Sequence, residues 1–207
     1  MRTLVALLLA PALARADAKV DWARGLVIAD GVGIADRHAP NPAVARGTSR
    51  RGAEAAAKKQ IAQKLGELPV AAGGKLGERA KDPDVQARLA AAVEHAIALA
   101  ADPETDGAWR VTMAVPIEAV RQALTGPRAL EDGDRGPQVV VIDGVTAKPA
   151  IGWKVGAHEA ATLWVAQLPA WAKDAPHVQA KAAKAGVIDV PDPGATPATL
   201  FVIVTKP

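Results

Sequence analysis

Residues 25–68 decide the fold of this chain and read GLVIADGVGIADRHAPNPAVARGTSRRGAEAAAKKQIAQKLGEL. The segment begins with a short apolar run, residues 25–29, which is typical of a strand. An Asp-Gly pair follows as a turn signal, and residues 32–35 resume the apolar character. Gly33 in this second run indicates either a bulge or a close approach by another part of the backbone, because glycine otherwise weakens a strand.

The same segment predicts one long helix after a polar, proline-containing loop. Asn41 fits the N-cap position and Pro42 the first helical position. We expect the helix to run from Pro42 or Ala43 to Leu65, with an apolar face formed by Ala53, Ala57, Ile61 and Leu68 and with Leu65 at its edge. Because alanine dominates this face, the helix can lie close against a sheet.

The rest of residues 17–127 predicts two further helices and a β-hairpin. Asp82 as N-cap and Pro83 as first residue begin the second helix, whose apolar stripe comprises Val85, Leu89, Val93 and Ile97. The hairpin has strands at 96–101 and 109–115 around a turn at 102–107, and a short helix follows at 117–124. The predicted fold class is therefore α+β, with an antiparallel sheet and helices packed on one face.

A charged, glycine-containing linker at residues 128–136 separates this part from residues 137–207, which we expect to form a small β-rich domain. The strand candidates there are residues 138–143, 149–155, 161–165, 186–190 and 199–205. Turn signals recur between them, which favours a small sheet over parallel α/β units.

Residues 1–16, MRTLVALLLAPALARA, have the pattern of a secretory signal peptide, with Arg2, an apolar stretch and a small-x-small cleavage site. They are too short to span a membrane, and no second apolar run of spanning length follows. The formal net charge is +3; without Arg2 and Arg15, 23 basic residues face 22 acidic ones, which leaves +1. We therefore expect an exported protein, periplasmic or secreted, with no transmembrane segment and no nucleic-acid partner.

The order of these pieces resembles a family of small exported bacterial proteins. An alanine-rich helix at 45–65 follows a glycine-containing strand, a hairpin carries Asp-Gly-Ala-Trp-Arg-Val at 106–111, and Val-Pro-Ile at 115–117 leads into a short helix. Residues 139–151 add a strand, an aspartate and a Lys-Pro-Ala element. This order resembles the family of the twenty-kilodalton membrane-associated lipoprotein and the N-terminal domain of the flagellar assembly protein T. The chain has no cysteine, so we expect no lipid anchor.

The sequence singles out no catalytic residue, cofactor site or metal site. The Gly31-x-Gly33 spacing of a dinucleotide fingerprint would need a third glycine where Asp36 stands. A zinc-binding HExxH motif starting at His158 would need a histidine where Thr162 stands. The one serine, Ser49, falls inside the long helix. A hydrolase with an unrecognised pair of carboxylates stays the weakest alternative.

Two groups of residues are candidates for binding. Around the start of the long helix lie basic side chains that can dock an acidic partner: Arg37, His38, Arg46, Arg50 and Arg51. The alternative is that they are merely solvated. In the C-terminal part, Trp153, Trp164 and Trp171 can either stack on sugar rings or pack in the core. The resulting hypothesis is an exported, non-enzymatic envelope protein that acts in assembly or binds an unidentified envelope protein, and the alternative is a glycan-binding module.

Overall fold

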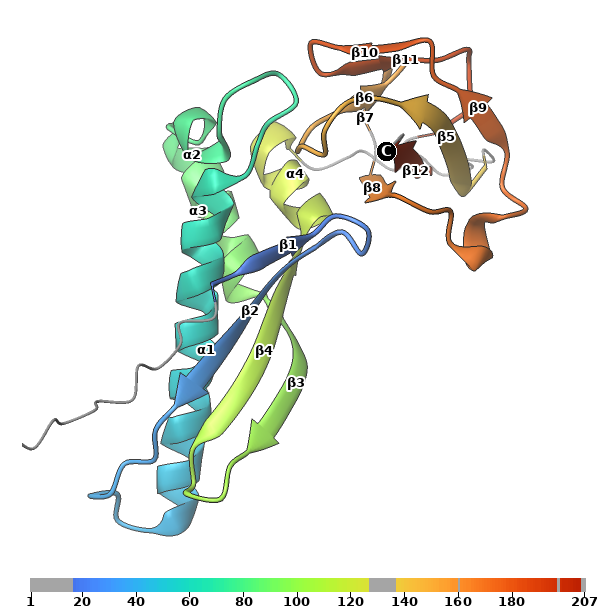
Figure 1. The fold of residues 1–207 in the computed structure, drawn as a ribbon. Coiled ribbons are helices and arrows are strands. Elements are labelled where there is room, and N and C mark those ends of the chain that lie inside the picture. Colours follow the sequence, from blue (N-terminus) through green and yellow to red (C-terminus); the bar gives the residue numbers. More distant parts are fainter. Residues whose placement is uncertain (1–16, 127–136, 160, 197, 206–207) are drawn as a thin grey trace, which may run out of the picture.

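The structure of the protein is a computed structural model, which describes residues 17–126 and 137–205 except residues 160 and 197. The fold is α+β, as predicted. Residues 17–126 form an antiparallel sheet with helices, and residues 137–205 form a unit of strands joined by loops (Figure 1). In the described part of the chain, no helix combines the length and the apolar character that crossing a membrane would require.

The N-terminal sheet has the strand order β1-β2-β4-β3, with every neighbouring pair antiparallel. Its strands are β1 (Lys19–Asp21), β2 (Leu26–Gly33), β3 (Ile97–Pro103) and β4 (Trp109–Pro116). The predicted hairpin is confirmed as β3 and β4. The long helix α1 (Pro42–Glu67) lies against β2 and β4.

The predicted turn at Asp30-Gly31 is wrong, because β2 continues through it and pairs without interruption from Leu26 to Gly33. No bulge occurs at Gly33, which lies opposite Trp109 in register. Gly31 and Gly33 instead allow α1 to approach. A Cβ atom on Gly31 would lie 1.9 Å from the carbonyl oxygen of Ala53. The close-approach interpretation of Gly33 is therefore the right one.

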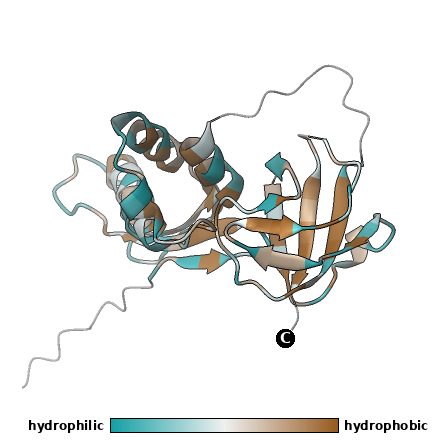
Figure 2. Cartoon of the chain, turned by 90° about the horizontal axis from the view of Figure 1, so that it is seen from above, coloured by the Kyte–Doolittle hydropathy of each residue, from teal (hydrophilic) through white to brown (hydrophobic). Residues whose placement is uncertain are grey.

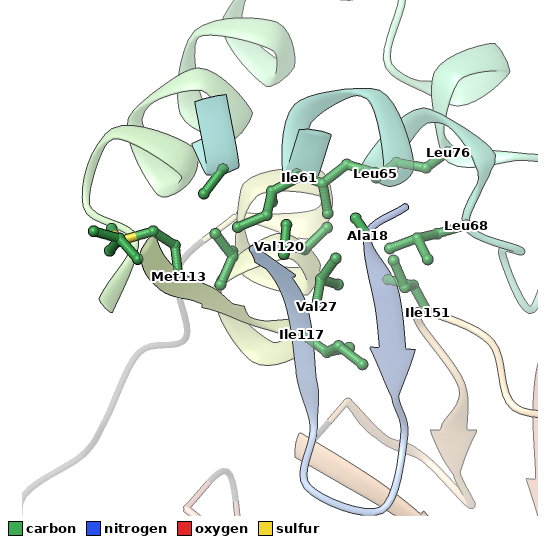
Figure 3. Close-up of a cluster of buried hydrophobic side chains, with 14 of the residues drawn as sticks. Ala18, Val27, Ile61, Leu65, Leu68, Leu76, Met113, Ile117, Val120 and Ile151 are labelled. Carbon is green, nitrogen blue, oxygen red and sulfur yellow. The ribbon is translucent and has the colours of Figure 1, made fainter. Parts of the chain in front are cut away.

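Helix α1 begins as predicted: the Asn41 side chain accepts a hydrogen bond from the Val44 backbone N–H at 2.9 Å, and Pro42 occupies the first turn. It ends two residues later than expected, at Glu67. Its buried face comprises Ser49, Ala53, Ala57, Ile61 and Leu65. The apolar side chains of this face and the β2 and β4 residues beneath them make one core, which Leu68, Leu76 and Ile151 extend (Figure 3).

The other helices are α2 (Leu76–Arg79), α3 (Pro83–Glu94) and α4 (Ile117–Thr125). Asp82 caps α3 as predicted, accepting from the Asp84 N–H at 2.8 Å. The apolar stripe of α3 stops at Val93, because Ile97 belongs to β3 and is 51% exposed. The single turn of α2 was not predicted from the sequence.

The C-terminal unit contains two four-stranded sheets, and Figure 2 shows its more hydrophobic strands in brown. One has the order β8-β12-β5-β9, and all its pairs are parallel. Its strands are β5 (Val139–Val145), β8 (Ala161–Val165), β9 (His177–Gln179) and β12 (Leu200–Thr205). Loops, short strands and a single 3-10 turn, η1 (Ala170–Ala172), connect these parallel strands in place of the usual crossover helices.

The second sheet, of order β10-β11-β6-β7, consists of two- and three-residue strands. They are β6 (Lys154–Val155), β7 (His158–Glu159), β10 (Ala182–Lys184) and β11 (Val187–Asp189). The strand predicted at residues 149–155 is thus only two residues long. The linker predicted at 128–136 lies outside the described residues.

Backbone hydrogen bonds join the two units. The Ala71 N–H donates to the Ile151 carbonyl at 2.8 Å, and the Ile151 N–H donates to the Pro69 carbonyl at 2.9 Å. The Trp164 N–H donates to the Trp22 carbonyl at 3.0 Å. The Ile151 side chain is part of the N-terminal core. The β-rich unit is therefore docked on the end of the sheet where β1 ends and β2 begins (Figure 1).

Candidate functional site

The basic side chains predicted to bind a partner lie at one end of the molecule, where β2 ends and α1 begins, remote from the C-terminal unit (Figure 1). All five are exposed: Arg37, His38, Arg46, Arg50 and Arg51. The loop that carries the first two is ordered by Asp36, whose carboxylate accepts the His38 backbone N–H at 2.8 Å. The fold thus gathers on one end what the sequence distributes over 15 positions, residues 37–51.

Arg50 is engaged within the protein. Its Nε donates to the Glu54 carboxylate at 3.1 Å, one helical turn further along α1. Its guanidinium also lies over the Trp109 ring, 5.4 Å from the ring centre. A cation over an indole face is attractive, and here it covers the half-buried ring at the start of β4. Arg50 therefore has a structural role that the sequence did not indicate.

Arg37, Arg46 and Arg51 form no ion pair with any described residue. The Arg51 guanidinium folds back toward the helix start, where it would come within 3.7 Å of a Cβ on Gly47. The first turn of α1 contains no acidic residue. The positive end of the helix dipole and the three guanidinium groups without an ion-pair partner therefore all contribute positive potential to this end of the molecule.

Exposed apolar side chains accompany these charges. Ile34, just after β2, is 75% exposed, and Val44 in the first turn of α1 is 41% exposed. We call the group Ile34, Arg37, Val44, Arg46 and Arg51 the tip surface. Arginine is enriched in protein–protein interfaces, and the exposed Ile34 and Val44 add apolar area that such a contact would bury. An acidic surface with apolar side chains at its centre would complement it.

The three C-terminal tryptophans do not share a surface. Trp153 is 8% exposed and Trp164 is 3% exposed, and their rings pack with centroids 5.9 Å apart and planes tilted by 53°. Only Trp171, in η1, is open to solvent, at 60%. Since two of the three indoles fill the core, they cannot form the sugar-stacking platform of the alternative hypothesis, and core packing is the better interpretation of that pair.

The remaining sequence motifs have structural explanations. Gly31 and Gly33 pack closely against the backbone of α1, and they form no phosphate-binding loop. The Ser49 hydroxyl is buried and donates to the Gly33 carbonyl at 2.6 Å. His177 Nδ1 lies 2.7 Å from the Asp143 carboxylate, but within the described residues no group of three potential metal ligands forms.

A small cleft of about 240 Å³ lies between the two units, lined by residues of α4, the segment 70–79 and the segment 152–159. Arg121 of α4 is 5% exposed there, and the Glu118 carboxylate accepts from its Nε and its Nη2, each at 2.8 Å. This hydrogen-bonded pairing with Glu118 raises the pKa of Arg121 despite the opposing effect of burial. The i,i+3 spacing of Glu118 and Arg121 is the sequence signal that could have revealed the pair.

The sequence matches no protein-family model, and it matches no curated protein significantly.

Proposed function

We propose that this protein is an exported, non-enzymatic component of a bacterial envelope that binds another envelope protein through the tip surface. The observation that carries the proposal is that exposed Ile34 and Val44 lie at the same end of the fold as three arginines that have no acidic partner among the described residues. Folding alone does not favour a cation close to the positive end of a helix, such as Arg46 in the second turn of α1, where it costs at most a few tenths of a kcal/mol. Binding an acidic partner would offset that cost.

Two further features support the proposal. The pattern of residues 1–16 is that of an export signal, and the order of elements resembles exported envelope proteins. The tip surface also lies at the far end of the N-terminal unit, so a partner could contact it without meeting the β-rich unit (Figure 1). Residues 1–16 retained on protein isolated from the envelope would contradict export.

The test is site-specific photo-crosslinking in cells. A photoreactive side chain at Ile34 is expected to capture one specific protein, whereas the same group at Trp171, exposed on the other unit, is expected to capture none. The triple variant Arg37→Glu/Arg46→Glu/Arg51→Glu should abolish capture at residue 34, because it reverses the charge that attracts an acidic partner.

A matched control changes the net charge equally at exposed positions of the C-terminal unit: Lys173→Glu/Lys181→Glu/Lys184→Glu. Capture at residue 34 should survive in this control. Capture that persists in the arginine variant, or that disappears equally in both variants, would refute the tip surface as the binding site.

A further inference from the structure

A groove of about 430 Å³ lies between α1, α2 and α3. Its volume falls within the range of about 300–1,000 Å³ that is usual for small-molecule sites. Its floor is apolar and buried, since Leu65 is 4% and Leu76 is 1% exposed. We call it the helical groove.

The helical groove exists because α3 does not close on α1. Leu89 and Val93, which the sequence places on the core-facing stripe of α3, are only half-buried, and both line the groove. The positions that could have filled the space carry small residues: Ala62, Gly66, Gly77, Ala80 and Ala90. The apolar stripe of α3 is thus left available to a ligand.

Both ends of the groove are closed. At one end, a Cβ on Gly77 would lie 3.1 Å from the Gly66 carbonyl oxygen, so α2 touches α1 backbone to backbone. At the other end, the Lys58 Nζ donates to the Glu94 carboxylate at 2.9 Å and to the Glu94 carbonyl at 2.7 Å. Lys58 and Gly66 are eight positions apart on one helix, which sets a groove length of ~12 Å.

The charge at the Lys58 end is positive. Lys58 is neutralised by Glu94, but the adjacent Lys59 lines the groove and has no ion-pair partner among the described residues. One ammonium group therefore stands next to an apolar, closed-ended groove. Since an α-helix is itself about 10–12 Å across with its side chains, a groove closed at both ends suits a single extended chain better than a helix.

We propose that the helical groove binds a single aliphatic chain with an anionic head group, with the chain along Leu65, Leu89 and Val93 and the head beside Lys59. The groove length defines the chain length. An extended polymer advances about 1.2 Å per bond, as a polypeptide does at three bonds per 3.3–3.6 Å, so ~12 Å accommodates about ten carbons.

The first experiment is calorimetric titration of the mature protein with hexanoate, octanoate, decanoate and dodecanoate, each kept below its micelle-forming concentration. Affinity should rise about fourfold for each added CH₂ group up to about ten carbons and then level off. Octanol, which lacks the charge, should bind at least threefold more weakly than octanoate. Absence of saturable binding, or affinity that keeps rising with chain length, would overturn the proposal.

The second experiment fills the groove. Ala90→Phe places a ring in the space, and it should weaken decanoate binding by more than tenfold. Ala91→Phe, at an exposed position on the same helix that does not line the groove, is the matched control and should bind normally. If Ala90→Phe fails to fold, Ala62→Phe on α1 replaces it. Equal binding by the filled variant and the control would refute the site.

Lys59 is tested separately. Lys59→Gln should reduce octanoate affinity to that of octanol without changing octanol binding, and Lys59→Arg should restore it. Loss of octanol binding in Lys59→Gln would indicate an altered groove in place of a lost charge contact, and unchanged octanoate affinity would remove Lys59 from the site.

Discussion

Gly33 of β2 lies so close to Ser49 of α1 that a Cβ atom on Gly33 would stand 1.8 Å from the Ser49 carbonyl oxygen. The Ser49 hydroxyl donates in return to the Gly33 carbonyl at 2.6 Å. Helix and strand therefore meet backbone to backbone at this point. No side chain can be inserted there without moving α1 away from the sheet.

Gly33→Ala should destabilise the protein by about 3 kcal/mol or more, because the added methyl overlaps a backbone atom that cannot rotate away. The measurement is the free energy of unfolding in urea. Gly52→Ala is the matched control, since a Cβ there would meet only Gly33 Cα, at 3.8 Å. That variant should gain up to about 1 kcal/mol from the higher helix propensity of alanine. A loss below about 1 kcal/mol for Gly33→Ala would contradict the close approach.

Arg46 and Arg50 should respond in opposite directions to glutamine substitution. Arg46→Gln removes an unpaired cation near the helix start and should stabilise the fold by a few tenths of a kcal/mol. Arg50→Gln loses the contacts with Glu54 and the Trp109 ring and should cost about 0.5–1 kcal/mol. Thermal denaturation at low ionic strength measures both. Equal effects of the two substitutions would show that the contacts of Arg50 with Glu54 and Trp109 contribute nothing to stability.

Glu118→Gln should cost about 1–3 kcal/mol, because it leaves the buried guanidinium of Arg121 without its carboxylate. The double variant Glu118→Gln/Arg121→Met should lose less than Glu118→Gln alone, since it removes the buried charge as well. Glu54→Gln, which breaks the exposed pair with Arg50, serves as the comparison and should stay within about 1 kcal/mol. A double variant less stable than the single one would show that the Arg121 side chain contributes through packing.

The pKa of the Glu94 carboxyl should lie below its usual value of 4.5, because the hydrogen bond from Lys58, and then the Lys58 charge, favour the ionised form. Since the folded-state pKa is lower than the unfolded one, the stabilising effect of the Lys58–Glu94 pair is present above pH 4.5 and is lost as the pH falls through the folded-state value. Side-chain NMR titration measures this. Lys58→Met should return Glu94 to its usual pKa; an unchanged value would assign the shift to another group.

The sequence determined by itself the features that depend on neighbours a few residues apart. Asn41 and Pro42 mark the start of α1, Asp82 and Pro83 mark that of α3, and the alanine face of α1 follows from helical spacing. Capping and helical periodicity involve residues within one or two turns of each other. A short stretch of sequence is therefore enough to predict where these helices begin and which face is buried. The same is true of the hairpin β3–β4, whose strands are joined by a short turn.

Only the tertiary structure decided the features that depend on residues far apart in the chain. Gly33 permits both a bulge and a close contact, and the choice depends on Ser49, 16 positions away. The Trp153 side chain could by its chemistry lie either on the surface or in the core. It is buried because it packs against Trp164 and the neighbouring strands. The parallel register of β5 and β12 pairs residues about 60 positions apart, as at Val140 and Phe201. The helical groove arises because α3 does not pack closely against α1. Packing, unlike capping, depends on which surfaces from distant parts of the chain come into contact. The residues next to a position in the sequence do not specify that contact.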